Sequence, residues 1–250
     1  HLQALEQDQQ SGRQLQLKLY PQQDLHLGKY HFSHCMIPSL YLSGDFLEYI
    51  RFGEEHLGFY IADVSGHGVS SAFVTALLRH FSLNIHRETR EAALDGKPIP
   101  FPTPADAMAY YNRELLAAGI DKYATLFMGL IDRKSNVLTY SVAGHLPRPI
   151  LASGDKVYYL EGGGMPVGIL QEAEYQNFTV QLPDTFTLVL CSDGVLEIMP
   201  AADLIAKEAL LLELVKSSDR TQKGIEEKLN LDDVSGAPDD IAVMTLVKTA

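Results

Sequence analysis

The sequence is poor in cysteine and has no long apolar run. Only Cys35 and Cys191 occur in 250 residues, which excludes a disulfide framework and leads us to expect a reducing compartment, the cytoplasm. No stretch approaches the roughly 18 apolar residues that span a bilayer, and no secretory pattern opens the chain, so we expect no membrane association. Because the chain begins at His1, we expect that another segment precedes it in a longer protein.

Basic residues are also scarce. Lys and Arg number 20 against 32 Asp and Glu, which gives a formal net charge of -12. A nucleic-acid partner requires a basic surface, so this composition argues against that class of function. The excess of carboxylates instead suits a protein that collects cations.

Several catalytic motifs are missing at the spacing that their chemistry requires. A cysteine-dependent phosphatase needs Arg six residues after its Cys, but Tyr41 and Glu197 stand at those positions. No G-x-x-x-x-G-K-[ST] loop, complete G-x-G-x-x-G motif or G-x-S-x-G elbow occurs, so nucleotide cradling and serine-hydrolase chemistry are unsupported. His31, His34 and Cys35 lack a fourth zinc ligand at a suitable spacing, which favours packed or exposed histidines.

Apolar periodicity predicts mainly strands after residue 41, joined by short turns that imply antiparallel pairing. The predicted strands are 45–52, 57–62, 124–132, 137–142, 149–152, 157–160, 177–181, 186–191 and 241–248. Helices are predicted at 69–86, 104–118 and 201–229, the last broken near 217–219, with a surface loop at 88–103. Residues 2–20 have a weaker helical pattern, for which a polar tail is the alternative. The predicted fold class is α+β, one domain preceded by a helical linker.

Four acidic sites lie where predicted strands begin or end. They are Asp45 after Ser43-Gly44, Asp63 after the strand at 57–62, Asp193 within Ser192-Asp193-Gly194, and the doublet Asp239-Asp240. Any one of them could simply form a turn. Hard divalent cations take carboxylate, carbonyl and water ligands, and a two-ion centre needs several aspartates from distant segments. The recurrence therefore favours a site for Mn²⁺ or Mg²⁺.

Taken in order, these motifs resemble the bacterial serine phosphatases of the SpoIIE and RsbU type, a branch of the PPM metal-dependent protein phosphatases. The matching stretches are 15–21, Ser43-Gly44-Asp45-Phe46, Asp63-Val64-Ser65-Gly66-His67-Gly68, Thr125-Leu126-Phe127, Ala143-Gly144-His145, 165–168, Ser192-Asp193-Gly194 and Asp239-Asp240-Ile241. The resemblance implies a two-sheet antiparallel β-sandwich flanked by helices, with two Mn²⁺ or Mg²⁺ ions at one end.

The resemblance also implies roles for individual residues. Asp63 would bridge both ions with the carbonyl of Val64 as a further ligand, Asp193 and Asp239 would complete one ion, and Asp45 would hold the other. Asp239 is expected to be the ligand and Asp240 to tolerate an amide, because adjacent residues entering a strand point to opposite faces. His67 could act as general acid, with a turn-stabilising or solvent-facing histidine as the alternative.

The implied function is hydrolysis of phosphoserine or phosphothreonine by a metal-activated water, usually on an anti-sigma factor antagonist. Residues 1–22 would be a linker helix to a missing upstream domain, such as a response-regulator receiver, and could pair two chains. Residues 23–250 would be the phosphatase domain. Two alternatives stay open: a catalytically weak member of the fold that only binds its phosphoprotein, and another metallohydrolase such as a phosphodiesterase, which the charge of -12 disfavours.

Overall fold

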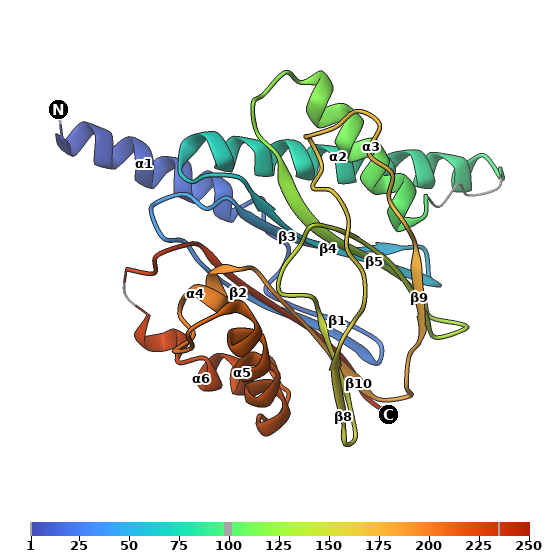
Figure 1. Cartoon of the computed structure of the whole chain (residues 1–250). Helices are drawn as coiled ribbons and strands as arrows, with labels where there is room; N and C mark the ends of the chain where they lie inside the picture. The colour runs from blue at the N-terminus through green and yellow to red at the C-terminus, as the bar shows by residue number, and fades with distance from the viewer. Residues whose placement is uncertain (1, 98–101, 235) are drawn as a thin grey trace.

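The computed structural model describes residues 2–97, 102–234 and 236–250. Two antiparallel sheets pack face to face, and helices cover the outer face of each sheet (Figure 1). This four-layered α+β sandwich confirms the predicted fold class. No helix in the described ranges is both long and apolar enough to cross a membrane.

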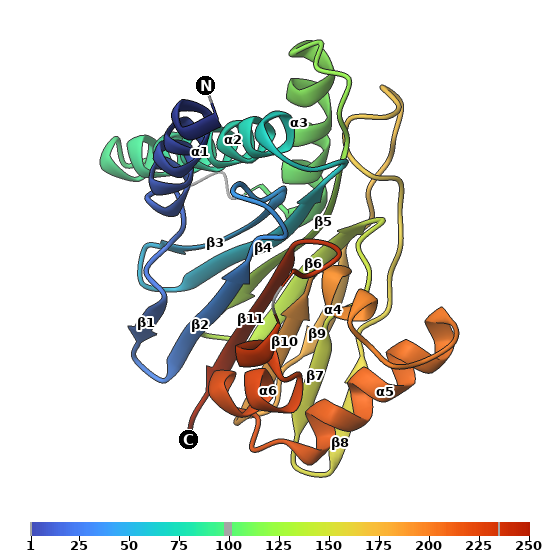
Figure 2. The same cartoon turned by 90° about the vertical axis from the view of Figure 1, so that its left-hand side faces the viewer.

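The first sheet has five strands in the order β3-β4-β5-β6-β9. Its strands are β3 (Asp45–Phe52), β4 (His56–Val64), β5 (Ala124–Asp132), β6 (Val137–Ala143) and β9 (Phe178–Gln181). Helices α2 (Val69–Leu94) and α3 (Pro104–Ala117) cover its outer face, and the N-terminal helix α1 (Leu2–Leu17) ends beside α2 (Figure 2).

The second sheet has six strands in the order β1-β2-β11-β10-β7-β8. Its strands are β1 (Asp24–Leu27), β2 (Tyr30–Ile37), β7 (Ile150–Ser153), β8 (Lys156–Tyr159), β10 (Phe186–Cys191) and β11 (Ile241–Lys248). The helices α4 (Gly194–Glu197), α5 (Leu204–Ser217) and α6 (Gln222–Lys228) and the 3₁₀ turn η1 (Leu231–Asp233) lie on its outer side.

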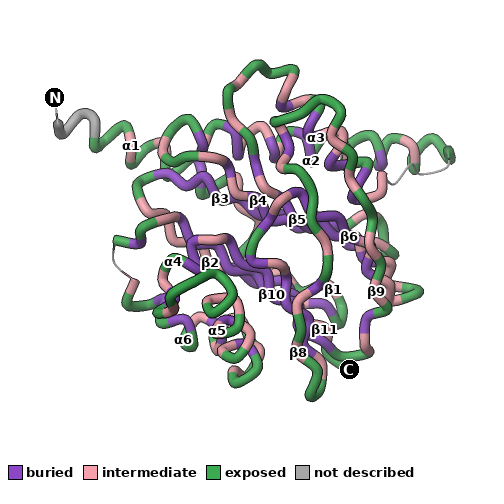
Figure 3. Tube along the Cα trace, in the orientation of Figure 1, coloured by how far each residue is buried: buried purple, intermediate pink, exposed green. Residues whose placement is uncertain are grey.

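The buried side chains form three layers, which Figure 3 shows as buried strands beneath more exposed helices. Residues such as Phe59, Phe127 and Leu188 fill the space between the sheets. A second cluster joins the five-stranded sheet to α2 and α3, and a third joins the six-stranded sheet to α4, α5 and α6. The side chains of the central strands thus alternate between two apolar layers, as expected for sheets covered on both faces, whereas the edge strands β1, β8 and β9 expose every second residue.

Two predictions about local structure are wrong. Helix α2 continues to Leu94, so 88–94 of the expected loop are helical, because good helix formers such as Glu91, Ala92 and Ala93 extend it. The part of that loop at 98–101 lies outside the described residues. Strands β1 and β2 fall in a region where no strand was predicted, although the alternation of the aromatic Tyr30 and Phe32 with the polar His31 and Ser33 is a strand signal.

Candidate metal centre

Two aspartates face each other across the first two strands of the five-stranded sheet. Asp45 opens β3 and is paired directly with Asp63 in β4. Directly opposed residues in an antiparallel pair project to the same face, with Cβ atoms about 4.5–5.5 Å apart. That face is the one on which Leu47 and Ile61 fill the space between the sheets. The strand register therefore places both carboxylates at one end of the sandwich interior.

The six-stranded sheet brings a second pair of aspartates to the same end. Asp193 directly follows Ser192 at the end of β10, and Asp239 precedes β11, its antiparallel partner. Ser192 ties the two strand ends together, since its N–H donates to the Ala242 carbonyl at 2.9 Å and the Ala242 N–H donates to its Oγ at 2.8 Å. Gly194 is required here, because a Cβ at this position would lie 1.9 Å from the Asp240 carbonyl oxygen.

The carboxylates from the two sheets influence one another electrostatically. Burial raises the pKa of Asp63 to about 8, and the nearby charges of Asp193 and Asp239 add to the shift. Burial and the charge of Asp63 raise the pKa of Asp45 well above its usual range. Burial and the charge of Asp239 likewise raise the pKa of Asp193. Such shifts show that negative charge is concentrated here without a compensating cation from the protein.

This donor set fits hard divalent cations. Asp45 Oδ2 is buried and has no hydrogen-bond partner within the described residues, which is the condition of an oxygen that a cation would satisfy. No three described His, Cys, Asp or Glu side chains close around one point as a formed metal site. Mutual repulsion between carboxylates opposes such closure until a cation offsets it. Carboxylate oxygens are the ligands that Mg²⁺ and Mn²⁺ prefer.

Val64 and His67 lie on the segment that joins β4 to α2. Val64 is buried, and its N–H donates to the Gly44 carbonyl at 3.1 Å, so the strand end is held against the start of β3. An added Cβ on Gly44 would lie 3.0 Å from the Val64 carbonyl oxygen, which explains the need for glycine at this close approach. His67 is exposed and forms no hydrogen bond with the described residues. Its role as general acid stays a prediction.

Asp240 is the residue whose role the sequence did not reveal. It is 3% exposed and accepts three hydrogen bonds from the loop before β3. Its Oδ1 accepts from the N–H and hydroxyl of Ser39 at 2.7 and 2.9 Å, and its Oδ2 accepts from the Gly44 N–H at 2.7 Å. Because both oxygens are occupied by donors, the expectation that an amide is tolerated here has to be revised. Asp240 holds the loop that carries Asp45.

The N-terminal helix also contacts this loop. Gln16 is 6% exposed, its Nε2 donates to the Ser43 carbonyl at 2.7 Å, and the Ser43 N–H donates to its Oε1 at 3.0 Å. Farther along, Tyr20 stacks on Phe46 with ring centroids 5.5 Å apart. The last turn of α1 and the residues after it are therefore packed onto the domain, although sequence periodicity gave no sign of these polar contacts.

A buried histidine connects the ends of the two sheets. His145 is 1% exposed, its Nε2 lies 2.9 Å from the Cys191 carbonyl oxygen, and its Nδ1 lies 3.4 Å from the Thr125 hydroxyl. Burial lowers the pKa of His145 to about 4, so the ring is neutral at ordinary pH. Thr125 is paired with Asp63 in the β4–β5 ladder, and Cys191 lies two residues before Asp193. His145 therefore fixes the spacing of two candidate ligands.

The histidine and cysteine residues considered for zinc do not form a common site. His31 stacks on His26, with ring centroids 3.8 Å apart, and its Nε2 lies 3.2 Å from Asp24 Oδ1. His34 is buried beside the Tyr49 hydroxyl at 3.1 Å. Cys35, the next residue in β2, packs in the helical layer on the opposite face of the sheet. These positions agree with the interpretation of packed or exposed histidines.

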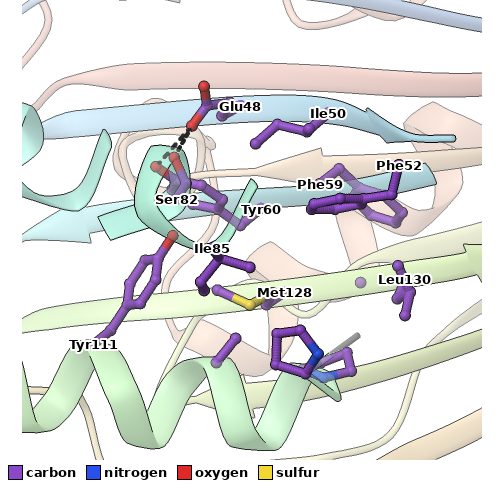
Figure 4. Close-up of a pocket in the computed structure, with 15 residues that line it drawn as sticks. Glu48, Ile50, Phe52, Phe59, Tyr60, Ser82, Ile85, Tyr111, Met128 and Leu130 are labelled. Atoms are coloured by element: carbon purple, nitrogen blue, oxygen red, sulfur yellow. Dashed lines mark hydrogen bonds between the residues drawn. The ribbon is translucent and has the colours of Figure 1, made fainter. Parts of the chain in front are cut away.

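An apolar cavity of about 50 Å³ lies away from the carboxylates, between the five-stranded sheet and helices α2 and α3 (Figure 4). Glu48 lies at its edge, accepts hydrogen bonds from Tyr60 and Ser82, and forms an ion pair with Arg79 at 3.4 Å. Burial raises the pKa of Glu48. Arg79 also donates to the Leu19 carbonyl, so this cluster fixes α2 to the sheet and to the end of the N-terminal segment. None of the five candidate metal ligands lines the cavity.

Solved structures share this architecture. The chain is similar to the SiaA-PP2C domain of Pseudomonas aeruginosa, with a TM-score of 0.77 at 17% identity over 100% of this chain and 98% of that one. It is also similar to the RsbU and RsbW domains of Rv1364c from Mycobacterium tuberculosis, with a TM-score of 0.72 at 23% identity over 88% of this chain and 62% of that one. The fold is that of PP2C-type protein phosphatases.

Sequence comparison identifies the branch. The family model described as Stage II sporulation protein E (SpoIIE) matches residues 53–248, and the chain belongs to this family of protein phosphatases. Phosphoserine phosphatase RsbU of Bacillus subtilis is 27% identical over 164 residues, which cover 64% of this chain and 45% of that protein. The chain spans between 34% and 45% of the length of the curated relatives that it matches.

The raised pKa of Asp63 predicts how stability changes with pH. Its value of about 8 lies far above the roughly 3.9 of an unfolded aspartate. The folded protein holds the Asp63 proton more tightly than the unfolded chain does. The contribution of Asp63 to the free energy of unfolding is therefore full below about pH 4 and is lost as the pH rises toward 8. We expect the Tm in chelator to fall between about pH 5 and 8, and Mn²⁺ to raise the Tm more at the upper end. Circular dichroism melts measure both, and a flat profile in chelator would contradict the assignment.

Proposed function

We propose that this chain is a metal-dependent phosphatase that hydrolyses phosphoserine on a regulatory protein. The observation that carries the proposal is that Asp45 and Asp63 from one sheet lie near Asp193 and Asp239 from the other, and that the buried Asp45 Oδ2 has no partner among the described residues. The resemblance noted from the sequence and the name of the relative RsbU support phosphoserine as the substrate group.

In the proposed mechanism the protein supplies ligands and positioning. Asp63 would hold both Mn²⁺ or Mg²⁺ ions, and the Val64 carbonyl would be a further ligand. Asp193 and Asp239 would complete one ion, and Asp45 would hold the other. When bound, two such ions supply an activated water and offset the charge that develops on the phosphoryl oxygens. His67 is exposed on the adjacent loop, where a protonated imidazole could give its proton to the serine oxygen as that oxygen leaves phosphorus.

The proposed substrate is a phosphorylated anti-sigma factor antagonist. RsbU and RsbP of Bacillus subtilis are both named phosphoserine phosphatases, and the related Rv1364c structure contains RsbU and RsbW domains. The acidic net charge of -12 agrees with a protein substrate rather than a nucleic acid. The free thiols of Cys35 and Cys191 agree with the cytoplasm as the proposed location.

A turnover assay separates the phosphatase from its alternative. The full chain is incubated with a phosphorylated anti-sigma factor antagonist and Mn²⁺ or Mg²⁺, and released phosphate is measured. We expect turnover that chelator abolishes and excess metal restores. Activity that persists in excess chelator would contradict the metal mechanism, whereas tight binding of the phosphoprotein without release of phosphate would favour the catalytically weak binding module.

The proposal includes a two-part organisation, with residues 1–22 as a linker from an upstream domain, such as a receiver of a response regulator, and 23–250 as the phosphatase domain. Two leucines near the end of α1 support an additional contact, because Leu15 is 65% exposed and Leu17 is 47% exposed. Residues two positions apart lie on different sides of a helix, so the two leucines offer separate apolar contacts and not one stripe. Exposed apolar side chains tend to find partners, and a second copy of the helix is the partner we propose.

Sedimentation tests this pairing of chains. We expect the full chain to form a dimer and the double variant Leu15→Glu with Leu17→Glu to be monomeric, because two carboxylates would then face each other at the contact. Gln16 stays in place in this variant, so the contact with Ser43 is kept. Leu94→Glu at the far end of α2, where Leu94 is 77% exposed, is the matched control. A monomer for the unmodified chain would refute the pairing.

A further inference from the structure

A second recess opens beside Asp193, which is the one candidate ligand in its lining. This Asp193 hollow has a volume of about 300 Å³ and is lined by Leu146, Asp193, Leu196, Ala202, Leu204 and Lys207, with two more carboxylates at its edge. Leu146 follows His145 after β6, and Asp193 directly precedes α4. The other residues come from α4, from the first turns of α5 and from the segment between them. The hollow therefore shares a wall with the candidate metal centre.

Apolar side chains form half of its lining, four of eight residues. Leu146 is 41% exposed and Leu204 is 46% exposed, while Leu196 forms a floor that is 4% exposed. Single exposed leucines are common on protein surfaces, but several around one recess mark a binding site. The free energy gained by covering them is available to a ligand that brings an apolar side chain.

The backbone around the hollow is fixed before any ligand arrives. Asp203 caps α5, since its Oδ1 accepts from the Ala206 N–H at 2.9 Å. The Leu196 N–H donates to the Asp193 carbonyl at 2.7 Å, and the neighbouring Val195 is fully buried in the core of this layer. Preformed recesses of this kind bind ligands without a large ordering cost.

The charged side chains around the hollow indicate which group of a ligand would lie next to its apolar side chain. Asp193, Glu197 and Asp203 are negative, and Lys207 is the cation of the lining. Lys207 makes no ion pair with any residue in the described part of the chain. An acidic group on the ligand would find a partner at Lys207 and repulsion elsewhere, which restricts the orientation in which it binds.

We infer that the Asp193 hollow is a specificity subsite that takes an apolar side chain flanking the phosphoserine of a protein substrate, with Lys207 pairing with an acidic side chain nearby. This inference rests on the proposed function. When the phosphoserine of a substrate lies at Asp193, the residues before and after it in the substrate lie over the adjoining surface. The hollow, with its volume of about 300 Å³, accommodates a side chain such as leucine.

The test uses the full chain with Mn²⁺ and two kinds of substrate. One is a set of short phosphoserine peptides in which each flanking position is either leucine or serine, with and without an added glutamate. The other is p-nitrophenyl phosphate, which has no flanking residues. We expect the unmodified chain to prefer leucine at one flanking position by about tenfold or more in kcat/KM, the range that a hydrophobic pocket gives.

Two variants remove the subsite without touching the candidate ligands. Leu204→Asp should abolish the preference for leucine, and Lys207→Glu should abolish the benefit of glutamate, while turnover of p-nitrophenyl phosphate stays unchanged in both. Leu94→Asp, which changes an exposed leucine elsewhere, is the control. Equal hydrolysis of all peptides, whatever their flanking residues, would contradict the subsite but not the proposed phosphatase activity. The same holds if the variants lower the turnover of both kinds of substrate alike. Absence of turnover on every substrate would remove the proposed function together with the subsite.

Discussion

Replacing Asp63 with asparagine should abolish metal-dependent turnover while the chain stays folded. The amide keeps the shape of the side chain but loses the charge that would hold two cations. In the β3–β4 pair, Asp45 is the residue opposite position 63, and it is itself a candidate ligand. Loss of a residue that only supports a ligand typically costs 10–100-fold, so loss of the bridging ligand should cost more than that. Released phosphate and isothermal titration with Mn²⁺ measure the two effects.

Asp193→Asn should behave in the same way, because Asp193 lies close enough to Asp63 to raise its pKa. Asp155→Asn, which changes an exposed carboxylate in the turn between β7 and β8, serves as the matched control and should leave turnover and metal binding unchanged. In chelator at about pH 8, Asp63→Asn should raise the Tm, since a buried charge is removed. Full activity in either site variant would show that the metal centre lies elsewhere.

Variants of Asp239 and Asp240, the doublet before β11, should distinguish a metal ligand from a residue that supports the site. Asp239→Asn is expected to lose turnover as severely as Asp63→Asn with little change of Tm in chelator, because Asp239 is only partly buried and accepts a hydrogen bond from its neighbour's N–H. Asp240→Asn should lose activity by about 10–100-fold and also lower the Tm in chelator. Its amide nitrogen would meet the N–H of Gly44 or the donors of Ser39, which leaves a buried donor unsatisfied.

The loss of Tm expected for Asp240→Asn follows from its hydrogen bonds with Ser39 and Gly44. An unsatisfied buried group costs about 1–3 kcal/mol, and each kcal/mol moves the Tm of a domain of this size by about 2–4 °C. Differential scanning calorimetry in chelator therefore distinguishes the two variants, independently of activity. The opposite order, with Asp240→Asn inactive at unchanged Tm and Asp239→Asn destabilised, would exchange the two roles and move the metal ligand by one residue.

Much of the fold could be predicted because apolar periodicity is a local signal. The strands that contain Asp45 and Asp63 were predicted within two residues of their observed ends, and the break in the helical region 201–229 appears between α5 and α6. The acidic sites were recognisable because each stands beside an apolar run. Periodicity within a single segment is enough for such features.

The contacts that hold the site together could not be predicted in this way. Asp240 and Gly44 are 196 residues apart in the sequence, and Gln16 lies 27 residues before Ser43. Such hydrogen bonds depend on which strand ends meet, and a sequence pattern does not specify that before the topology is known. The strands β1 and β2 were missed because polar residues interrupt the apolar character of the segment. His31 preserves the alternation of β2, but His34 lies on the same face as Tyr30 and Phe32 and breaks it.

The position of β11 has a consequence for how the protein is made. This last strand lies between β2 and β10 and pairs with both. Tyr30 and Ile37 of β2 therefore gain their partners Lys248 and Ile241 only after β11 has been synthesised. During synthesis, which proceeds at about 5–20 residues per second, β2 and β10 have no neighbour on their shared side until β11 leaves the ribosome. The unpaired edges are aggregation-prone during that interval. Since Asp239 and Asp240 arrive only just before β11, the nascent chain cannot assemble its carboxylate cluster before the sheet is ready to close.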